Sequence, residues 1–367
     1  MPKKLKIIVL CGGESPEYEV SLASGKTCIK NFDEKYLILP VVILKNGLWL
    51  FGEKYFNFKE KKHIEKWFES IESLTKQKSD SQIINKALPI YDAIHRIQTD
   101  SPALIFIVLH GNRGEDGTIQ GLFEFLRIPY TGSGVLASSL GMDKHRFQKL
   151  LDYHKIKIPP HVIVFEYESE IESFIKEAEE KIGYPFFVKP SRCGSSVGMA
   201  IAKNRVELAR AIEDARKFDR EVLIEEYIKG IEVTCGVLNL VGKNGEDEIV
   251  VFQPTEIIPK EAEFFDYTSK YTPGKSDEIT PARLPKDKIN EIQKLAERVH
   301  RLAGASGFSR VDIILRDDIP FVLEINTIPG MTSLSLLPQG AKASGYDFSS
   351  LLDEIVKYTL KFRRENL

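Results

Sequence analysis

The fold is decided by the stretch Arg310-Val-Asp-Ile-Ile-Leu-Arg-Asp-Asp-Ile-Pro-Phe-Val-Leu-Glu-Ile-Asn-Thr-Ile-Pro-Gly330. Two mainly apolar runs, residues 311–315 and 321–325, flank the polar segment 316–320. Short runs of this composition separated by turn residues predict two β-strands joined as a hairpin. Side chains alternate along a strand, so the hairpin carries one face of charged and amide side chains.

The register of this hairpin decides which polar side chains meet. A hairpin symmetric about Asp318 places Asp312 opposite Glu324. The same register places Arg310 opposite Asn326. Two carboxylates and a carboxamide therefore converge on one spot, with an arginine beside them.

This convergence predicts a metal site. Like charges directly opposite each other on neighbouring strands are destabilising, so Asp312 and Glu324 call for a cation. Ligands that are all oxygen favour Mg²⁺ or Mn²⁺, usually shared with the phosphates of a substrate. The alternative is a charged face that is merely solvated, as many antiparallel sheets have. The apolar flanks oppose this alternative, because a buried carboxylate pair without a counter-ion is costly.

Composition describes an ordinary globular protein. Of the 367 residues, 43% are hydrophobic and 28% charged, and this length predicts two or three domains. A net charge of −2 gives no electrostatic footprint for nucleic acid or an anionic membrane. No apolar run approaches the ~20 residues of a membrane span, and the run after the basic start ends at Cys11-Gly-Gly, as a first strand does. The four cysteines lack C-x-x-C spacing, which predicts a reducing cytoplasm.

The N-terminal part of the chain alternates strands with helices. Predicted buried strands at 6–11, 37–44 and 103–109 lead into turns, two of them rich in glycine. This alternation predicts a small parallel α/β domain with ligand contacts at the carboxyl ends of its strands. The dinucleotide fingerprint G-x-G-x-x-G is absent, which disfavours a nicotinamide oxidoreductase. Residues 54–101 are charged and weakly patterned, so we interpret them as a peripheral elaboration and infer no function from them.

Two loops in the rest of the chain have functional composition. Residues 190–199 are rich in glycine and serine and follow Lys189, so their amides and hydroxyls fit a phosphate. The lysine precedes the glycines, so this is not a Walker motif. Residues 264–281 lack a regular pattern but carry aromatic and phenolic side chains, which favours an ordered active-site lid over a disordered linker.

Taken in order, the motifs resemble those of the D-alanine:D-alanine ligases, members of the ATP-grasp superfamily. The resemblance covers nearly the whole chain. The matched blocks are Gly12-Gly13 with Glu17 and 19–21, His110-Gly111, 142–144, 189–191 with 194–199, Asp266-Tyr267 with Lys270-Tyr271, 310–312, Glu324, and 326–333 except residue 328.

The resemblance implies a mixed α/β fold of three domains, in which a pre-ATP-grasp domain precedes the two ATP-grasp parts. The N-terminal parallel α/β domain would span 1–137. The central ATP-grasp part would span 138–225. The C-terminal part would span 226–367, with an active-site loop at about 255–282, and ATP would bind between the last two.

The resemblance also implies a reaction. The carboxylate of a first D-alanine attacks the γ-phosphate of ATP, giving an acyl phosphate and ADP. The amine of a second D-alanine then displaces phosphate and forms the dipeptide used in peptidoglycan precursors. The partners would be ATP and D-alanine, with no nucleic acid or membrane, and the protein would be a cytoplasmic homodimer.

Several residues would act on ATP by this resemblance. Two Mg²⁺ or Mn²⁺ ions on the phosphates would be held by Asp312, Glu324 and Asn326. Positive charge at the phosphates would come from Lys144, Lys189 and Lys270. The nucleoside would be held by Glu225 at the adenine amine, by Glu232 at the ribose and by the backbone of Ile228.

Four residues would act on the first amino acid by the same resemblance. Glu17 would bind the ammonium group of the first D-alanine. His110 would lie near its carboxylate. Hydrogen bonds would link Glu17 to the closing loop through Ser195 and Tyr271.

The resemblance places another four residues at the acyl-transfer step. Such a transfer needs neutralisation of charge first and exclusion of water second. Arg310 and the amide of Gly330 would stabilise the tetrahedral oxyanion. Ser335 and the amide of Leu336 would hold the carboxylate of the second D-alanine.

Two other functions remain open on this scaffold. A D-alanine:D-lactate or D-alanine:D-serine ligase would differ only in its second substrate. A non-catalytic ATP-binding module is opposed by the joint presence of the three predicted metal ligands and Arg310, because binding alone does not need an oxyanion arginine. Phosphate release that depends on D-alanine separates an enzyme from a binding module.

The first prediction concerns the nucleophile. We expect Tyr271 to favour an amine over a hydroxyl, because D-lactate-using relatives differ at this loop position. When D-alanine and D-lactate compete at neutral pH, product analysis is expected to show mainly D-alanyl-D-alanine. A preference for D-lactate would contradict this role.

Overall fold

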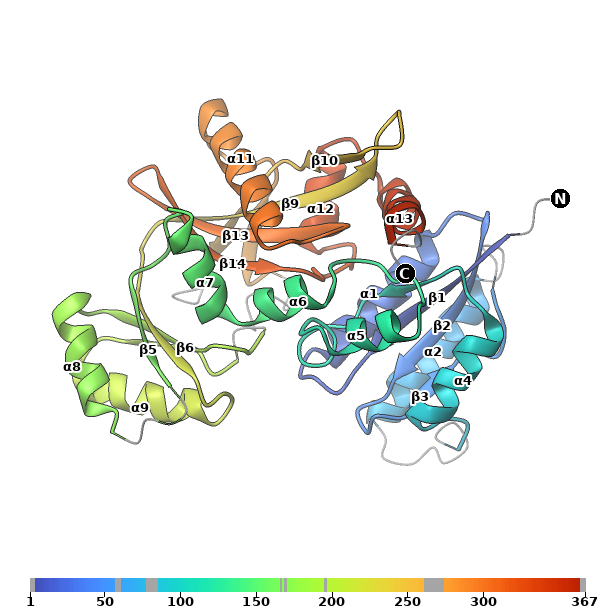
Figure 1. The fold of residues 1–367 in the computed structure, drawn as a ribbon, viewed down its shortest axis with the longest axis horizontal. Helices are drawn as coiled ribbons and strands as arrows, with labels where there is room; N and C mark the ends of the chain where they lie inside the picture. Colours follow the sequence, from blue (N-terminus) through green and yellow to red (C-terminus); the bar gives the residue numbers. More distant parts are fainter. Residues whose placement is uncertain are drawn as a thin grey trace.

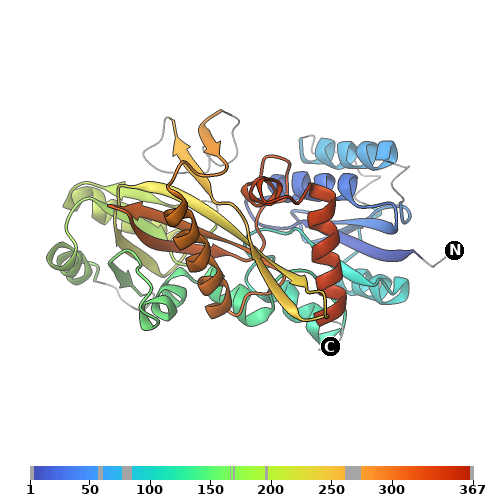
Figure 2. The ribbon, with the colours of Figure 1, turned by 90° about the horizontal axis from the view of Figure 1, so that it is seen from above.

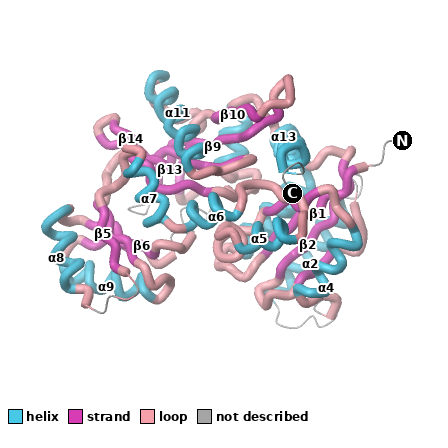
Figure 3. The backbone as a smooth tube through the Cα atoms, in the orientation of Figure 1, coloured by secondary structure: helices cyan, strands magenta, loops and turns pink. Residues whose placement is uncertain are grey.

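The computed structural model describes residues 4–56, 61–76, 85–165, 167, 170–194, 197–260 and 274–363. Within these residues the strands form three sheets. Figure 1 shows the N-terminal sheet and the sheet of the chain's middle part at opposite ends of the molecule, with the C-terminal sheet between them. The predicted mixed α/β fold is confirmed, and Figure 3 shows helices packed around all three sheets. No helix in these ranges is both long and apolar enough to span a membrane.

The N-terminal sheet has the predicted parallel arrangement. Its order is β3-β2-β1-β4, in which β1 runs parallel to β2 and to β4, and β3 returns antiparallel at the edge. Alternate side chains of β1 belong to two separate hydrophobic clusters, so the sheet is covered on both faces. The strands are β1 (Leu5–Gly12), β2 (Tyr36–Ile43), β3 (Trp49–Phe51) and β4 (Leu104–Ile107).

Within the described part of this domain four helices cover the sheet, and two of them correct the interpretation of residues 54–101. That segment contains helices on opposite faces of the sheet rather than a weakly patterned surface elaboration. Ile64, Phe68 and Ile71 form one helical stripe that is buried against the sheet, although charged residues dominate the helix around them. The four helices are α1 (Tyr18–Asn31), α2 (Lys61–Lys76), α4 (Ile90–Asp100) and α5 (Thr118–Phe125).

The middle sheet is antiparallel, with the order β5-β8-β6-β7. Helices α8 (Glu172–Lys181) and α9 (Arg205–Arg216) cover one face, where Phe186 and Val188 are buried. The alternate residues Phe187 and Lys189 therefore point to the other face. The strands are β5 (His161–Val164), β6 (Phe186–Pro190), β7 (Ala200–Ala202) and β8 (Val222–Glu226).

The C-terminal sheet is also antiparallel and has the order β12-β11-β9-β13-β14, with β10 paired to β9. The apolar stripe of α11 (Lys286–Leu302) packs on one face. Its strands are β9 (Ile231–Val241), β10 (Asp247–Val251), β11 (Thr255–Pro259), β12 (Ser276–Ile279), β13 (Phe308–Arg316) and β14 (Ile319–Asn326).

Helices α6 (Val135–Met142) and α7 (Lys144–Tyr153) follow the N-terminal sheet in the chain. The sequence predicts one helix over 142–154, and the structure has a break at Asp143. The Asp143 carboxylate accepts a hydrogen bond from the amide of Arg146, so Asp143 caps a new helix. Lys144 consequently stands in the first turn of α7, as predicted.

The predicted register of the β13–β14 hairpin is confirmed at its polar end. Asp312 pairs with Glu324, and Arg310 pairs with Asn326. The predicted centre is wrong, because a two-residue turn at Asp317 and Asp318, with φ of 50° and 62°, joins the strands. A bulge beside Asp312 adds one residue to β14 and restores the expected pairing.

The prediction that residues 264–281 lack regular structure is wrong at the C-terminal end of this stretch, where β12 forms. Within 255–282, strands β11 and β12 pair antiparallel and extend the C-terminal sheet. Short strands with few apolar residues give too weak an alternation to be recognised from sequence. The interior of this segment, 261–273, lies outside the described residues.

The last helices connect the C-terminal sheet to the N-terminal one. Leu351 and Ile355 of α13 belong to the same hydrophobic cluster as Val9 and Phe106 of the N-terminal sheet. Figure 2 shows α13 lying between that sheet and the β9–β10 ribbon. The final segments are α12 (Leu336–Ala343), α13 (Phe348–Tyr358) and a π-helical turn, η2 (Thr359–Arg363).

The cap of α13 gives a stability prediction. The Asp347 carboxylate accepts the amide hydrogen of Ser350 at 2.7 Å. We expect Asp347→Ala to lower the free energy of unfolding by about 1 kcal/mol, the usual cost of losing an N-cap. Asp347→Asn keeps an accepting oxygen and is the control, with a smaller loss in urea denaturation. Equal losses in both variants would contradict a capping role.

Candidate active site

The polar face of the hairpin lies between two pockets. The larger has a volume of about 750 Å³ and the smaller about 110 Å³. Glu324 lines both pockets. Arg310 and Asn326 line the larger pocket, and Asp312 lines the smaller one. The predicted convergence of these four side chains is therefore present, and it faces both cavities.

The two opposed carboxylates each have a cation from the chain itself. Arg310 donates from Nε and Nη2 to the two oxygens of Asp312, at 2.9 and 2.8 Å. The hydroxyl of Thr234 also donates to Asp312. Lys144 Nζ lies 3.4 Å from Oε2 of Glu324. Repulsion between Asp312 and Glu324 is thus reduced without any bound ion.

These contacts change the argument for a metal. Charge repulsion alone does not require a metal ion. Within the ranges given above, no group of three or more His, Cys, Asp or Glu side chains is arranged so that it could hold one. The oxygen donors of Asp312, Glu324 and Asn326 still fit a hard divalent cation that also binds phosphate. Asn326 is already oriented, because its side-chain oxygen accepts the amide hydrogen of Ile328 at 3.1 Å.

The smaller pocket lies between the middle and C-terminal sheets. Lys189 Nζ contacts Oε2 of Glu225 at 2.8 Å, and Gln148 donates to the other oxygen of Glu225 at 2.6 Å. The side chains of Lys189 and Glu225 are only 5% and 2% exposed. Ile228 and Glu232 line the same pocket. The structure thus brings together four of the six residues expected to bind ATP.

Lys144 lines the larger pocket beside Glu324, the residue that lines both pockets. Its ammonium group donates to the carbonyl oxygen of Cys193 at 2.8 Å and lies beside Glu324. Lys144 is almost fully buried, so its charge acts in a medium where electrostatic interactions are stronger than in water. The glycine- and serine-rich loop is held against α7 by this contact.

One end of the larger pocket is built by loops of the N-terminal sheet. Glu17 and His110 line it, and both are buried. The hydroxyl of Ser15 donates to the carbonyl oxygen of His110 at 2.7 Å and accepts from the amide of Glu17 at 3.2 Å, which joins the two loops. Nε2 of His110 has no hydrogen-bond partner among the described residues. Burial lowers the pKa of His110, against the charge of Glu17, so the imidazole is neutral near pH 7.

Sequence reasoning missed Glu115 at this end. Its carboxylate is buried, lines the larger pocket and accepts the amide hydrogen of Gly111 at 2.7 Å. Burial raises the pKa of Glu115 to about 8, and the charge of Glu17 adds to the effect. The sequence feature that could have indicated Glu115 is its position as an acidic residue in a glycine-rich loop that follows a buried strand.

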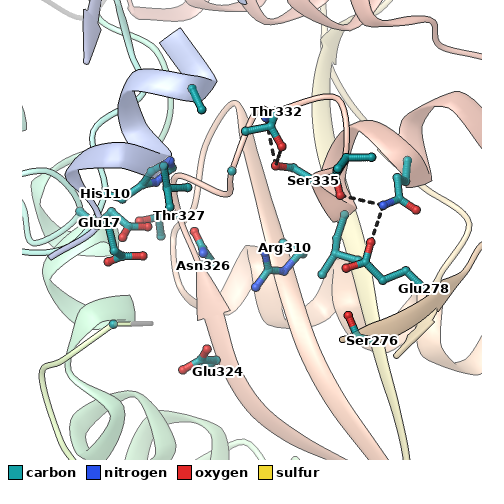
Figure 4. A pocket seen from close by; sticks show the side chains of 18 of the residues that line it. Glu17, His110, Ser276, Glu278, Arg310, Glu324, Asn326, Thr327, Thr332 and Ser335 are labelled. Carbon is teal, nitrogen blue, oxygen red and sulfur yellow. Dashed lines mark hydrogen bonds between the residues drawn. The ribbon is translucent and has the colours of Figure 1, made fainter. Parts of the chain in front are cut away.

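The opposite end of the larger pocket is the start of α12. Figure 4 shows Thr332 and Ser335 there, across the pocket from Glu17 and His110, with Arg310, Glu324 and Asn326 between. The Ser335 hydroxyl accepts from the amide of Thr332 at 3.0 Å and shares a hydrogen bond with its hydroxyl. A Cβ at Gly330 would lie 2.8 Å from the Ser335 oxygen, so a larger residue there would displace the Ser335 hydroxyl from its present position.

Leu336 packs against Ile257 of β11 and gives this end an apolar wall. Beside it, Gln339 donates to Glu278 of β12 at 2.5 Å. No pattern in the sequence singles out Glu278 or Gln339, because they become neighbours only through tertiary packing. The predicted residues Ser195, Lys270 and Tyr271 lie outside the described residues.

The fold and the paired pockets define this chain as an ATP-grasp enzyme. Two family models match it: "D-ala D-ala ligase N-terminus" over residues 6–133 and "D-ala D-ala ligase C-terminus" over 150–357. The chain belongs to the D-alanine–D-alanine ligase family.

Relatives of known name match the whole chain. The D-alanine–D-alanine ligase of Caldicellulosiruptor bescii is 39% identical over 99% of this chain and 97% of its own length. That of Syntrophobacter fumaroxidans is 38% identical over 98% and 99%.

Solved structures match equally far. The VanG D-Ala:D-Ser ligase of Enterococcus faecalis has a TM-score of 0.78 and 35% identity, covering 97% of this chain and all of that chain. The D-alanine–D-alanine ligase of Bacillus anthracis complexed with ATP has a TM-score of 0.73 and 29% identity, covering 99% of this chain and all of its own.

The raised pKa of Glu115 gives a pH prediction. Between about pH 4.5 and 8 the folded protein holds this proton and the unfolded chain does not, so stability falls as pH rises through that window. Glu115→Gln is expected to remove this slope, making the variant more stable than wild type at pH 8 but not at pH 4.5. Urea denaturation across this range measures it, with exposed Glu248→Gln as control. A parallel profile for wild type and variant would contradict the raised pKa.

Proposed function

We propose that this protein is an ATP-dependent ligase that joins two molecules of D-alanine through an acyl phosphate. One observation carries the proposal: relatives named D-alanine–D-alanine ligase match the chain from end to end. The site is consistent with it, because a cavity for two small zwitterions adjoins a smaller cavity that fits part of a nucleotide.

ATP would bind between a central part at 138–225 and a C-terminal part at 226–367, with 1–137 as the N-terminal domain. Glu225 would accept from the adenine amine, Glu232 would bind the ribose, and the backbone of Ile228 would contact the base. Lys189 would exchange part of its contact with Glu225 for the phosphates. Lys144 and Lys270 would add positive charge there.

Asp312, Glu324 and Asn326 would hold two Mg²⁺ or Mn²⁺ ions. Bound there, divalent ions would neutralise the phosphate oxygens and favour transfer of the terminal phosphoryl group. Arg310 donates hydrogen bonds to Asp312 from Nε and Nη2, so the orientation of its guanidinium group beside the larger pocket is fixed. A fixed donor costs no reorganisation when charge develops on the reacting carbonyl oxygen.

The larger pocket would hold the two amino acids end to end. Glu17 would bind the ammonium group of the first D-alanine, with neutral His110 near its carboxylate. Ser195 of the glycine- and serine-rich loop and Tyr271 would link Glu17 by hydrogen bonds to the closing loop at about 255–282. Gly330, through its amide, would share the oxyanion with Arg310.

The second D-alanine would bind at α12. Ser335 and the amide of Leu336 would hold its carboxylate, since the amides that begin a helix bind anions. The wall of Leu336 and Ile257 suits a methyl group. D-serine is the competing second substrate, because a D-Ala:D-Ser ligase is 35% identical to this chain.

The product would enter peptidoglycan precursors in the cytoplasm, and the enzyme would act as a homodimer. The proposal is tested by incubating the protein with ATP, Mg²⁺ and D-alanine, with and without D-serine. D-Alanyl-D-alanine and phosphate in equal amounts support it. A protein that releases no phosphate when D-alanine is added would be a binding module instead.

Two variants test the assigned chemistry. We expect Arg310→Ala to lower turnover by about 10²–10³-fold, the usual effect of losing one oxyanion donor. Glu324→Gln is expected to lower turnover by a similar order, because it removes a charged oxygen facing both pockets. Both variants are expected to keep the wild-type circular dichroism spectrum. Arg301→Ala on the exposed side of α11 is the control, and near-normal turnover in both site variants would reject these roles.

A further inference from the structure

Glu278 is a carboxylate in the larger pocket to which no role has yet been given. It lies on β12, directly opposite Ile257 of β11. Its Oε2 accepts a hydrogen bond from Nε2 of Gln339, in the first turn of α12. That same nitrogen donates to the carbonyl oxygen of Leu334 at 2.8 Å, so Gln339 fixes the position of the carboxylate.

Among the described residues, the side chains that α12 and β11 place beside Glu278 are uncharged. Helix α12 presents Leu336 and Gln339, and β11 presents Ile257. Arg310 of β13 is the charged group that acts on it from across the pocket. Burial raises the pKa of the Glu278 carboxyl above its usual range, against the hydrogen bond from Gln339 and the charge of Arg310. Such a carboxylate is a stronger proton acceptor than an exposed one.

The other carboxylates of this pocket are placed elsewhere. Glu17 and Glu115 lie at the loops of the N-terminal sheet, and Glu324 lies beside Lys144. The two remaining carboxylates that line the pocket have lysine partners: Glu19 pairs with Lys45, and Asp277 pairs with Lys260. Figure 4 shows Glu278 on the opposite side of the pocket from Glu17, close to Ser335. A carboxylate of the protein therefore lies next to the proposed binding site of the second amino acid. It cannot help to bind the carboxylate of that amino acid, but it can bind the ammonium group.

We propose that Glu278 binds the ammonium group of the second amino acid and accepts its proton before acyl transfer. This inference rests on the proposed function. An α-amino acid arrives as a zwitterion, and a protonated nitrogen has no electron pair with which to attack. One N–H bond breaks, its electron pair stays on nitrogen, and the proton moves to a Glu278 oxygen. The amine then forms the C–N bond, the acyl–oxygen bond breaks with its electron pair on the phosphate oxygen, and the second surplus proton of the nitrogen leaves with the phosphate.

Hydroxylamine separates this role from a structural one. It is largely uncharged at neutral pH, so it attacks an acyl phosphate without a base and gives D-alanyl hydroxamate. Wild type and Glu278→Gln are assayed with ATP and Mg²⁺, once with D-alanine alone and once with low D-alanine plus hydroxylamine. Glu256→Gln is the matched control, because Glu256 pairs with Arg283 on the other face of the same two strands.

We expect Glu278→Gln to lower kcat/KM for the second D-alanine about 10²-fold at pH 7, the lower end for loss of a general base. Hydroxamate formation should stay near the wild-type rate. The deficit should shrink as pH rises, since more D-alanine then arrives as the free amine. Glu278→Asp keeps a carboxylate and should recover part of the loss.

Three outcomes would overturn the inference. An unchanged rate of dipeptide formation would show that Glu278 takes no part. Equal losses with D-alanine and hydroxylamine, or a deficit independent of pH, would show that it only supports the fold. If wild type forms neither dipeptide nor hydroxamate, the proposed function itself fails.

Discussion

The opposition of Asp312 and Glu324 across one hairpin is the constraint on which the site depends. Two carboxylates that face each other on paired strands repel. In this fold a cationic side chain lies beside each of them, and the two cations come from different elements. Arg310 comes from the same strand as Asp312, whereas Lys144 comes from the start of α7. The cap at Asp143 that starts this helix therefore also sets the charge balance of the hairpin. Electrostatic compensation of this kind ties together segments that are far apart in the chain.

Strand alternation then distributes chemistry between the two cavities. In the middle sheet, Val188 enters the core and Lys189 points to the smaller pocket, and Ile224 and Glu225 divide in the same way. On each strand, one residue therefore packs in the hydrophobic core and the next residue lines the smaller pocket. Lys189 and Glu225 can both be charged although they are buried, because their mutual attraction offsets part of the cost of removing each charge from water. Removing either partner would leave an unpaired charge there.

Sequence predicted the parts of this molecule that have strong local patterns. The hairpin, its pairing of Asp312 with Glu324 and the parallel N-terminal strands follow from alternation and turn residues. The bulge beside Asp312 leaves no such signal, and the predicted register was right at the polar end only because the bulge offset a misplaced turn. Glu115 and Glu278 were missed because their environments depend on which distant elements pack around them. Helix α2 was missed because its buried stripe is narrow among charged residues.

The hydrophobic cluster that α13 shares with the N-terminal sheet has a consequence for biosynthesis. Residues at 351–356 cover apolar side chains made some three hundred residues earlier, and Arg363 stacks on the ring of Tyr130 at 3.9 Å while donating to the carbonyl of Gly132. When the N-terminal sheet emerges from the ribosome, one of its faces is therefore still incompletely covered. That face is covered only after α13 has been synthesised, so the nascent chain exposes apolar surface until then, a state in which chaperones protect unfinished proteins.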